Sequence, residues 1–186
     1  MKITDITHRN DLSLFLNKNK LIDTGAEVGV SKGSFANQIL KKWLGKKIFL
    51  VDIWNCPEIK KEAQNRLEVY KDRYQFIHKS SVAAATDILD NSLDFCYIDA
   101  CHRYSHVKED LNAWWSKVKE GGLFCGHDYS VNEKVWLSRR PHRKEFPNFG
   151  VAQAVDEFVK EKNLTLHVEP VPGDTDRATS WYIFKK

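Results

Sequence analysis

The chain has 186 residues, of which 42% are hydrophobic and 29% charged, and its formal net charge is +4. These values are typical of a soluble globular protein with a full-sized core, so we expect a single domain over residues 1–186. No apolar run approaches the roughly 20 residues of a membrane span, and a charge this small does not by itself indicate nucleic-acid binding.

The N-terminus begins without the hydrophobic region of a secretion signal, and we expect residues 1–20 to form a leading helical segment with a short helix over Asp11–Leu16. The four cysteines lie in apolar contexts without CxxC spacing, which favours buried, reduced thiols. Both observations predict a cytoplasmic protein.

Strand and helix patterns then alternate along the chain. The predicted strands are Leu21–Val28, Lys47–Asp52, Tyr74–His78, Leu93–Ile98, Leu123–Gly126, Leu164–Val168 and Trp181–Phe184. The predicted helices are Ser34–Leu44, Ile59–Tyr70 with Pro57 near its first turn, Val82–Leu89, Val107–Val118 closed by Gly121-Gly122, and Val151–Val159. This alternation predicts an α/β fold of Rossmann-like type, with a seven-stranded, mostly parallel sheet, helices on both faces and a C-terminal antiparallel hairpin.

One segment, residues 130–150, has no clear period. It is long for a connection within a compact domain, and its five basic and two acidic residues give it a net charge of +3. We expect a loop that binds substrate; a solvated surface loop is the alternative.

The connection after the first strand carries Glu27, Gly29, Gly33 and Ser34. A strand, a glycine-rich turn and a helix point backbone N–H groups at one spot, where Gly29 and Gly33 allow a ligand to approach and Ser34 can bind a carboxylate. The dinucleotide fingerprint GxGxxG would need glycine at position 27 or 31. An acid at 27 is unfavourable beside a pyrophosphate but favourable beside the cationic S-adenosylmethionine. The alternative is a turn without a ligand.

Asp52 ends the next strand, 19 residues after Gly33. An acid at this distance can accept hydrogen bonds from both hydroxyls of a ribose; a capping acid is the alternative. Ile53 follows and can flank an adenine ring or pack in the core. Ser81, after the third strand, can contact the adenine end or cap a helix.

Asp99 and His102 follow the fourth strand, and His127 and Asp128 follow the fifth. Two crowded carboxylates repel each other unless a cation or a proton lies between them, so Asp99 and Asp128 suggest a divalent metal. His102 can accept a proton from a hydroxyl group, although a lone histidine here is more often a surface or capping residue. A zinc site from Cys101, His102, Cys125 and His127 is disfavoured, because the spacings match no usual zinc motif.

With these motifs in order, nearly the whole chain resembles a class I S-adenosylmethionine-dependent methyltransferase, most closely the cation-dependent sugar O-methyltransferase type (macrocin O-methyltransferase-like). The residues that carry the resemblance are Glu27, Gly29, Gly33, Ser34, Asp52, Tyr97-Ile98-Asp99, His102, Tyr104, Asp110, Gly121-Gly122, Gly126-His127-Asp128-Tyr129, Gly150-Val151 and Ala154-Val155.

The resemblance implies a role for each matched position. Glu27 to Ser34 would hold the methionine part of the cofactor and Asp52 its ribose, with Asp99 also close to the cofactor. Asp99 and Asp128 would bind Mg²⁺ or Mn²⁺, and His102 would be the base. Several relatives carry two adjacent acids where this chain has His127-Asp128, and a histidine is a less favourable magnesium ligand than an oxygen. His127 is therefore a metal ligand, a substrate contact or an alternative base.

We accordingly expect methyl transfer to a hydroxyl of a sugar, glycan or other small molecule, assisted by a divalent cation. The alternatives are a metal-independent methyltransferase of another acceptor and a catalytically silent cofactor-binding protein. A nicotinamide oxidoreductase is disfavoured by the glycine pattern. A nucleic-acid base methyltransferase is disfavoured because residues 99–102 lack the Asp/Asn-Pro-Pro-aromatic run. We expect neither nucleic acid nor membrane as a partner, and a homo-oligomer would supply missing walls of an open substrate site.

Overall fold

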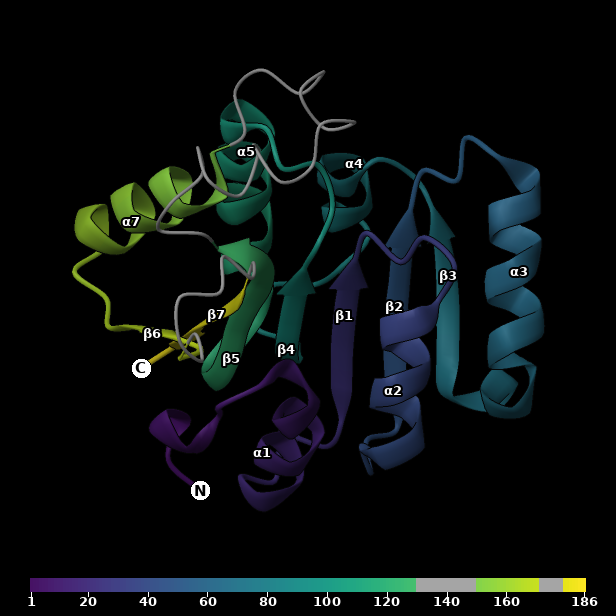
Figure 1. The fold of residues 1–186 in the computed structure, drawn as a ribbon, viewed down its shortest axis with the longest axis horizontal. Helices are drawn as coiled ribbons and strands as arrows, with labels where there is room; N and C mark the ends of the chain where they lie inside the picture. The colour runs from purple at the N-terminus through teal and green to yellow at the C-terminus, as the bar shows by residue number, and fades with distance from the viewer. Residues whose placement is uncertain (130–149, 171–178) are drawn as a thin grey trace.

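The computed structural model describes residues 1–129, 150–170 and 179–186. Its sheet has seven strands in the order β3-β2-β1-β4-β5-β7-β6 (Figure 1). The strands are β1 Thr24–Val28, β2 Lys47–Asp52, β3 Tyr74–His78, β4 Leu93–Ile98, β5 Val118–Tyr129, β6 Leu166–Val168 and β7 Thr179–Phe184. The first five in spatial order pair in parallel, and β7 is antiparallel to both β5 and β6. The predicted fold class, including the C-terminal antiparallel pair, is confirmed.

Helices cover both faces of this sheet (Figure 1). They are α1 Leu12–Lys18, α2 Ser34–Lys42, α3 Pro57–Leu67, α4 Ser81–Ala85, α5 Tyr104–Trp115 and α7 Val151–Glu161, with 3-10 helices at Ile3–Asp5, Arg9–Asp11 and Glu68–Arg73. One apolar core joins the sheet to α1, α2 and the end of α3, and the other joins it to α4, α5 and α7. The two cores hold the sheet rigidly from both sides. None of the helices in the described ranges is long and apolar enough to cross a membrane.

The strand register brings the carboxyl ends of the parallel strands to one level. Val28 of β1 pairs with both Val51 of β2 and Ile98 of β4, and Ile98 pairs in turn with Gly126 of β5. All six residues of β4 are buried, as expected for a central parallel strand with helices on both faces. Every connection that carries a predicted site residue after β1, β2, β4 or β5 therefore starts at the same edge, which is uppermost in Figure 1.

Two of the predicted helices were wrong in their extent. α5 ends at Trp115, and Val118 is already the first residue of β5, so Gly121-Gly122 lie inside a strand and do not close a helix. The pairing of β4 with β5 shifts register between the Leu93–Val118 and Phe95–Leu123 pairs. The shift places this glycine pair in the irregular stretch of β5, where Gly121 has a φ of +74°. The helix predicted over 82–89 is the shorter α4, because a short apolar run does not fix its own period.

The loop predicted over 130–150, with its basic residues, lies outside the described residues apart from Gly150. Its proposed contact with substrate stays a prediction.

Candidate functional site

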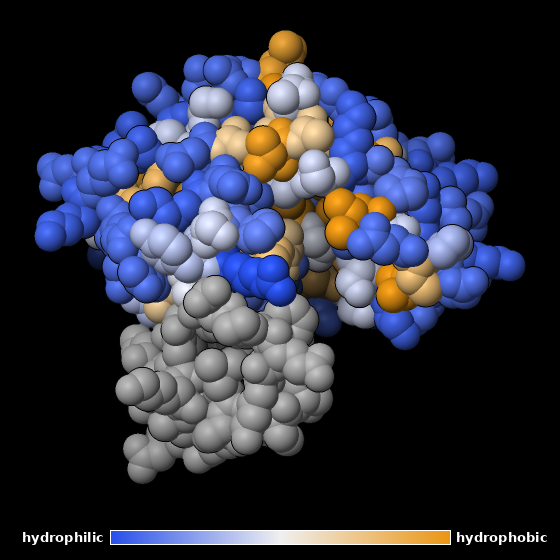
Figure 2. All heavy atoms as spheres, turned by 90° about the horizontal axis from the view of Figure 1, so that it is seen from above, coloured by the Kyte–Doolittle hydropathy of each residue, from blue (hydrophilic) through white to orange (hydrophobic). Residues whose placement is uncertain are grey.

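A cleft of about 630 Å³ opens at the edge where the parallel strands end. Figure 2 looks down on this edge, where the surface is hollowed and apolar residues lie beside hydrophilic ones. The volume is within the usual range for a small-molecule site. Five of the residues predicted to bind cofactor line the cleft, namely Gly29, Asp52, Ile53, Ser81 and Asp99.

Gly29 lies where the ends of three strands meet. Its N–H donates to the carbonyl of Val51 at 2.8 Å, and the N–H of Asp99 donates to the carbonyl of Val28 at 2.7 Å. Gly29 has a φ of +97°, and a Cβ at this position would lie 2.0 Å from the carbonyl oxygen of Asp99. Only glycine permits this backbone to pass so close to the end of β4.

Glu27 lies deep in β1 and does not line the cleft directly. Its side chain is buried, and its Oε2 has no hydrogen-bond partner among the described residues. Burial raises the pKa of Glu27 well above its usual value, the nearby charge of Asp99 raises it further, and Arg9 opposes the shift. Beneath the glycine turn there is thus a carboxyl group whose ionised form lacks a compensating donor.

The start of α2 is used differently from the prediction for Ser34. The Ser34 hydroxyl accepts a hydrogen bond from Arg66 of α3, and neither Ser34 nor Gly33 lines the cleft. Gly33 precedes α2 with a φ of +73° and packs against Ala63 and Leu67 of α3. The structure places these two residues at the contact between α2 and α3, and their predicted role in cofactor binding stays a prediction.

Asp52 organises the connections around it. Its Oδ2 accepts the backbone N–H of Ser31 at 2.7 Å, and its Oδ1 accepts that of Trp54 at 2.8 Å. A carboxylate has about four acceptor positions, so each oxygen can accept a further donor from a ligand in the cleft. Ile53, with 49% of its surface exposed, lines the cleft next to it. This arrangement suits a ribose on Asp52 with an apolar contact alongside.

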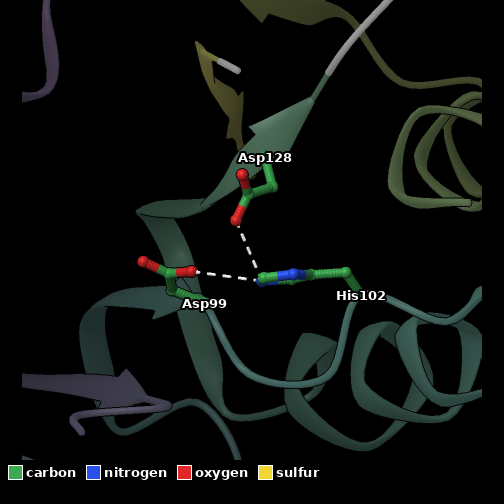
Figure 3. Close-up of side chains that lie close together, drawn as sticks. All are labelled: Asp99, His102 and Asp128. Carbon is green, nitrogen blue, oxygen red and sulfur yellow. Dashed lines mark hydrogen bonds and ion pairs between the residues drawn. The ribbon is translucent and has the colours of Figure 1, made fainter. Parts of the chain in front are cut away.

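Asp99 and His102, both in the connection between β4 and α5, converge with Asp128 of β5 (Figure 3). His102 Nε2 lies 2.9 Å from Asp128 Oδ2 and 3.5 Å from Asp99 Oδ1. One possible ligand atom from each residue lies within 4.8 Å of the other two. Among the described residues this is the cluster that could hold a metal, and it contains no cysteine.

A bulge in β5 turns Asp128 toward His102. The pairing of β5 with β7 shifts register between Gly126 and Tyr129, and Asp128 has a φ of +58° in that interval. Aspartate tolerates this left-handed conformation better than most residues, and bulges commonly redirect side chains beside active sites. The carboxylate thereby reaches His102, and His127 Nδ1 lies 3.5 Å from its Oδ2.

The charges in this cluster stabilise one another. Burial opposes protonation of His102, but hydrogen bonds and attraction from Asp128 and Asp99 outweigh it and raise its pKa to about 9. Burial likewise opposes ionisation of Asp128, while His102 and His127 hold its pKa well below the usual range. The cluster therefore exists as an imidazolium between two carboxylates at neutral pH. The cation expected between Asp99 and Asp128 is, in the protein alone, His102 itself.

Asp110 and His106 also line the cleft, from α5. No chemical role was predicted for Asp110, which was one of the residues that carried the family resemblance. Asp110 is buried on α5, and the other buried residues of this helix, Val107, Leu111 and Trp114, are apolar. A buried acid at an apolar position of a helical pattern was the signal that could have identified it.

Residues 26–129 match the family model described as a methyltransferase domain. No curated protein matches the sequence. Among solved structures, the chain is similar to an O-methyltransferase family protein from Burkholderia thailandensis, with a TM-score of 0.69 and 14% identity over 95% of this chain. The chain spans only 55% of the length of that protein.

Two other solved structures match along nearly their whole length. A Streptococcus mutans protein, named as a methyltransferase and solved in complex with SAH, has a TM-score of 0.68 and 13% identity over 100% of this chain and 99% of its own. An N-methyltransferase from Bradyrhizobium japonicum has a TM-score of 0.64 and 12% identity over 95% of this chain and 94% of its own. At these identities the likeness establishes a shared fold, and the relatives act on different acceptor atoms.

Proposed function

Because residues 26–129 match its model, this chain belongs to the methyltransferase domain family, and we propose that it transfers a methyl group from S-adenosylmethionine to a hydroxyl of a small molecule or glycan. One observation carries the proposal. Asp99 lines the cleft suited to the cofactor and is also a member of the Asp99–His102–Asp128 cluster. A methyl donor in the cleft and a hydroxyl at the cluster would thus meet at one residue, as an in-line transfer requires.

The residues of the cleft, together with Glu27 buried behind them, fit S-adenosylmethionine. Glu27 supplies a buried carboxyl oxygen without a donor, which suits the cationic methionine end of this cofactor. Asp52 supplies acceptors for two ribose hydroxyls, and Gly29 allows close approach of the backbone. The cofactor supplies an electrophilic methyl group on a sulfonium, and the chain positions it.

The cluster also fits a divalent cation, which Asp99 and Asp128 would hold beside His102. Two carboxylates are suitable ligands for Mg²⁺ or Mn²⁺, although an imidazole is less usual for magnesium. Such an ion would lower the pKa of a bound hydroxyl and compensate the carboxylates. His102 would then lose the interactions that keep it protonated and would be free to accept the hydroxyl proton, with His127 beside it.

A metal-independent transfer is the second candidate. It is favoured by the position of His102 Nε2 between the two carboxylates, since this imidazolium already supplies the positive charge that the pair requires. In this form the proton is accepted by His102 at elevated pH or by His127.

Calorimetry followed by a transfer assay tests the proposed function. We expect saturable binding of S-adenosylmethionine and S-adenosylhomocysteine, and none of NAD, because an acid at position 27 disfavours a pyrophosphate. With methyl-labelled cofactor, label should appear on hydroxyl oxygens in a panel of sugars, glycosylated compounds and other small alcohols. Preferential binding of NAD, or label found only on nitrogen atoms, would contradict the proposal.

Removal of divalent ions separates the two candidate mechanisms. After dialysis against a chelator we expect turnover to fall by about a hundredfold and to return with Mg²⁺ or Mn²⁺, the size of effect typical for stabilising a developing oxyanion. Binding of S-adenosylhomocysteine, measured on the same chelated sample, should be unchanged and serves as the control. Turnover that is indifferent to chelation would support the metal-independent candidate instead.

A further inference from the structure

Asp110 is a buried acid in the wall of the cleft that neither proposed mechanism uses. Only 4% of its surface is exposed, yet it borders the cleft from α5. Among the described residues, none forms an ion pair with it. Lys79, which also lines the cleft, pairs with Asp87 at 2.6 Å, and His106 of α5 attracts the Asp110 carboxylate less strongly than its hydrogen bond from Ser81 does. A carboxylate buried in this way requires hydrogen-bond donors.

A short chain of hydrogen bonds fixes the orientation of Asp110. The indole Nε1 of Trp114 donates to Ser81 Oγ at 2.9 Å, so the hydroxyl hydrogen of Ser81 is available for another acceptor. That hydrogen is donated to Asp110, which lowers the pKa of the acid, although burial has the larger effect and raises it to about 6. Ser81 therefore uses its one donor on Asp110. It fills only one of the carboxylate's four acceptor positions.

The strand order shows which end of the cleft Asp110 occupies. Asp99 follows β4 and Asp52 ends β2, whereas Ser81, the partner of Asp110, follows β3. In the order β3-β2-β1-β4, β3 is three strands from β4, a separation of about 14 Å at the usual strand spacing. A ligand with its reacting end at Asp99 and its ribose at Asp52 would extend its base toward Ser81 and Asp110.

We propose that Asp110 recognises the exocyclic amino group of the adenine of the cofactor, an inference that rests on the proposed function. An amino group offers the N–H donor that the carboxylate lacks. A base with an oxygen at that position would instead place an acceptor against the carboxylate. Asp110 is then the residue that selects adenine over 6-oxopurine, with Ser81 as its positioning residue.

Calorimetry with two ligands tests this role. S-adenosylhomocysteine and S-inosylhomocysteine differ at the six-position of the purine, where an oxygen replaces the amino group in the second and N1 gains a hydrogen. We expect wild-type protein to bind the adenosyl ligand at least about tenfold more tightly, and Asp110→Asn to reduce this preference to about threefold or less, because an amide can donate as well as accept.

Two further variants serve as controls. Glu109→Gln makes the same chemical change at an exposed acid that also lines the cleft, and it should keep the wild-type preference. Ser81→Ala removes the donor that positions Asp110 but keeps the carboxylate, so it should weaken the preference less than Asp110→Asn does.

The outcomes distinguish this inference from the proposed function. Failure of wild-type protein to bind S-adenosylhomocysteine would contradict the proposed function. Binding of both ligands with equal affinity by the wild type, or an undiminished preference in Asp110→Asn, would overturn the role of Asp110 alone. The wild-type comparison needs no variant and stands even if Asp110→Asn fails to fold.

Discussion

Replacement of His102 by alanine is expected to lower kcat by at least about a hundredfold, the usual contribution of a positioned general base. His102 is the residue that contacts both carboxylates of the cluster, at 2.9 and 3.5 Å, and it does not line the cleft. Its removal should therefore leave the Kd for S-adenosylhomocysteine within about threefold of the wild-type value. Asp128→Asn should produce the same pattern, because it removes the charge that orients the imidazole.

The pH dependence gives this prediction a second readout. With a pKa of about 9, His102 is protonated at neutral pH in the protein without a divalent ion and can accept a proton only as the pH rises. The metal-free rate should thus increase about tenfold per pH unit below pH 9 and level off above it, since only the neutral imidazole is competent. His102→Ala should lose this rise.

His106→Ala is the matched control for the loss of a histidine. His106 is exposed, lies four residues further along the chain and lines the cleft without belonging to the cluster. It should retain turnover close to that of the wild type. Near-normal rates in both His102→Ala and Asp128→Asn would refute the role given to the cluster.

The strands were the most predictable part of this fold. β2, β3 and β4 have the bounds that their apolar runs and polar ends predicted, because buried parallel strands are nearly continuous hydrophobic segments. The end of α5 was not predictable in the same way. Val118 continues the helical spacing of Val107, Leu111 and Trp114, yet it pairs with Leu93 in the sheet, and tertiary pairing overrides a local pattern.

The sequence was sufficient to predict which strand ends carry the site residues, but not how their side chains are placed relative to one another. That Asp99 and Asp128 lie at one edge follows from parallel pairing alone. The convergence of Asp128 with His102 depends on a bulge and a left-handed residue in β5, and neither is visible in the sequence. The contact of Ser34 with Arg66 depends likewise on how α3 packs against α2, which involves residues 32 positions apart.

Gly29→Ala is expected to destabilise the protein far more than Gly121→Ala, although both glycines have positive φ, at +97° and +74°. A Cβ at Gly121 would meet no atom within 4 Å, so only the backbone conformation is unfavourable and the cost should be about 1 kcal/mol. A Cβ at Gly29 would lie 2.0 Å from the carbonyl oxygen of Asp99 and 2.7 Å from the Cα of Ala100. Relief of that contact must move the backbone, and we expect a loss of about 3 kcal/mol in the free energy of unfolding.

The same backbone displacement should also lower the rate of methyl transfer, because Asp99 both lines the cleft and belongs to the Asp99–His102–Asp128 cluster. A shift of about 1 Å in a positioning group can cost about a hundredfold in rate. We therefore expect folded Gly29→Ala to lose about that much turnover and to bind S-adenosylhomocysteine more weakly, whereas Gly121→Ala keeps both. Denaturant unfolding gives the stability of each variant, calorimetry gives its affinity for S-adenosylhomocysteine, and the transfer assay gives its turnover. If the two variants were equally stable and equally active, the contact between the glycine turn and the end of β4 would not set the geometry of the site.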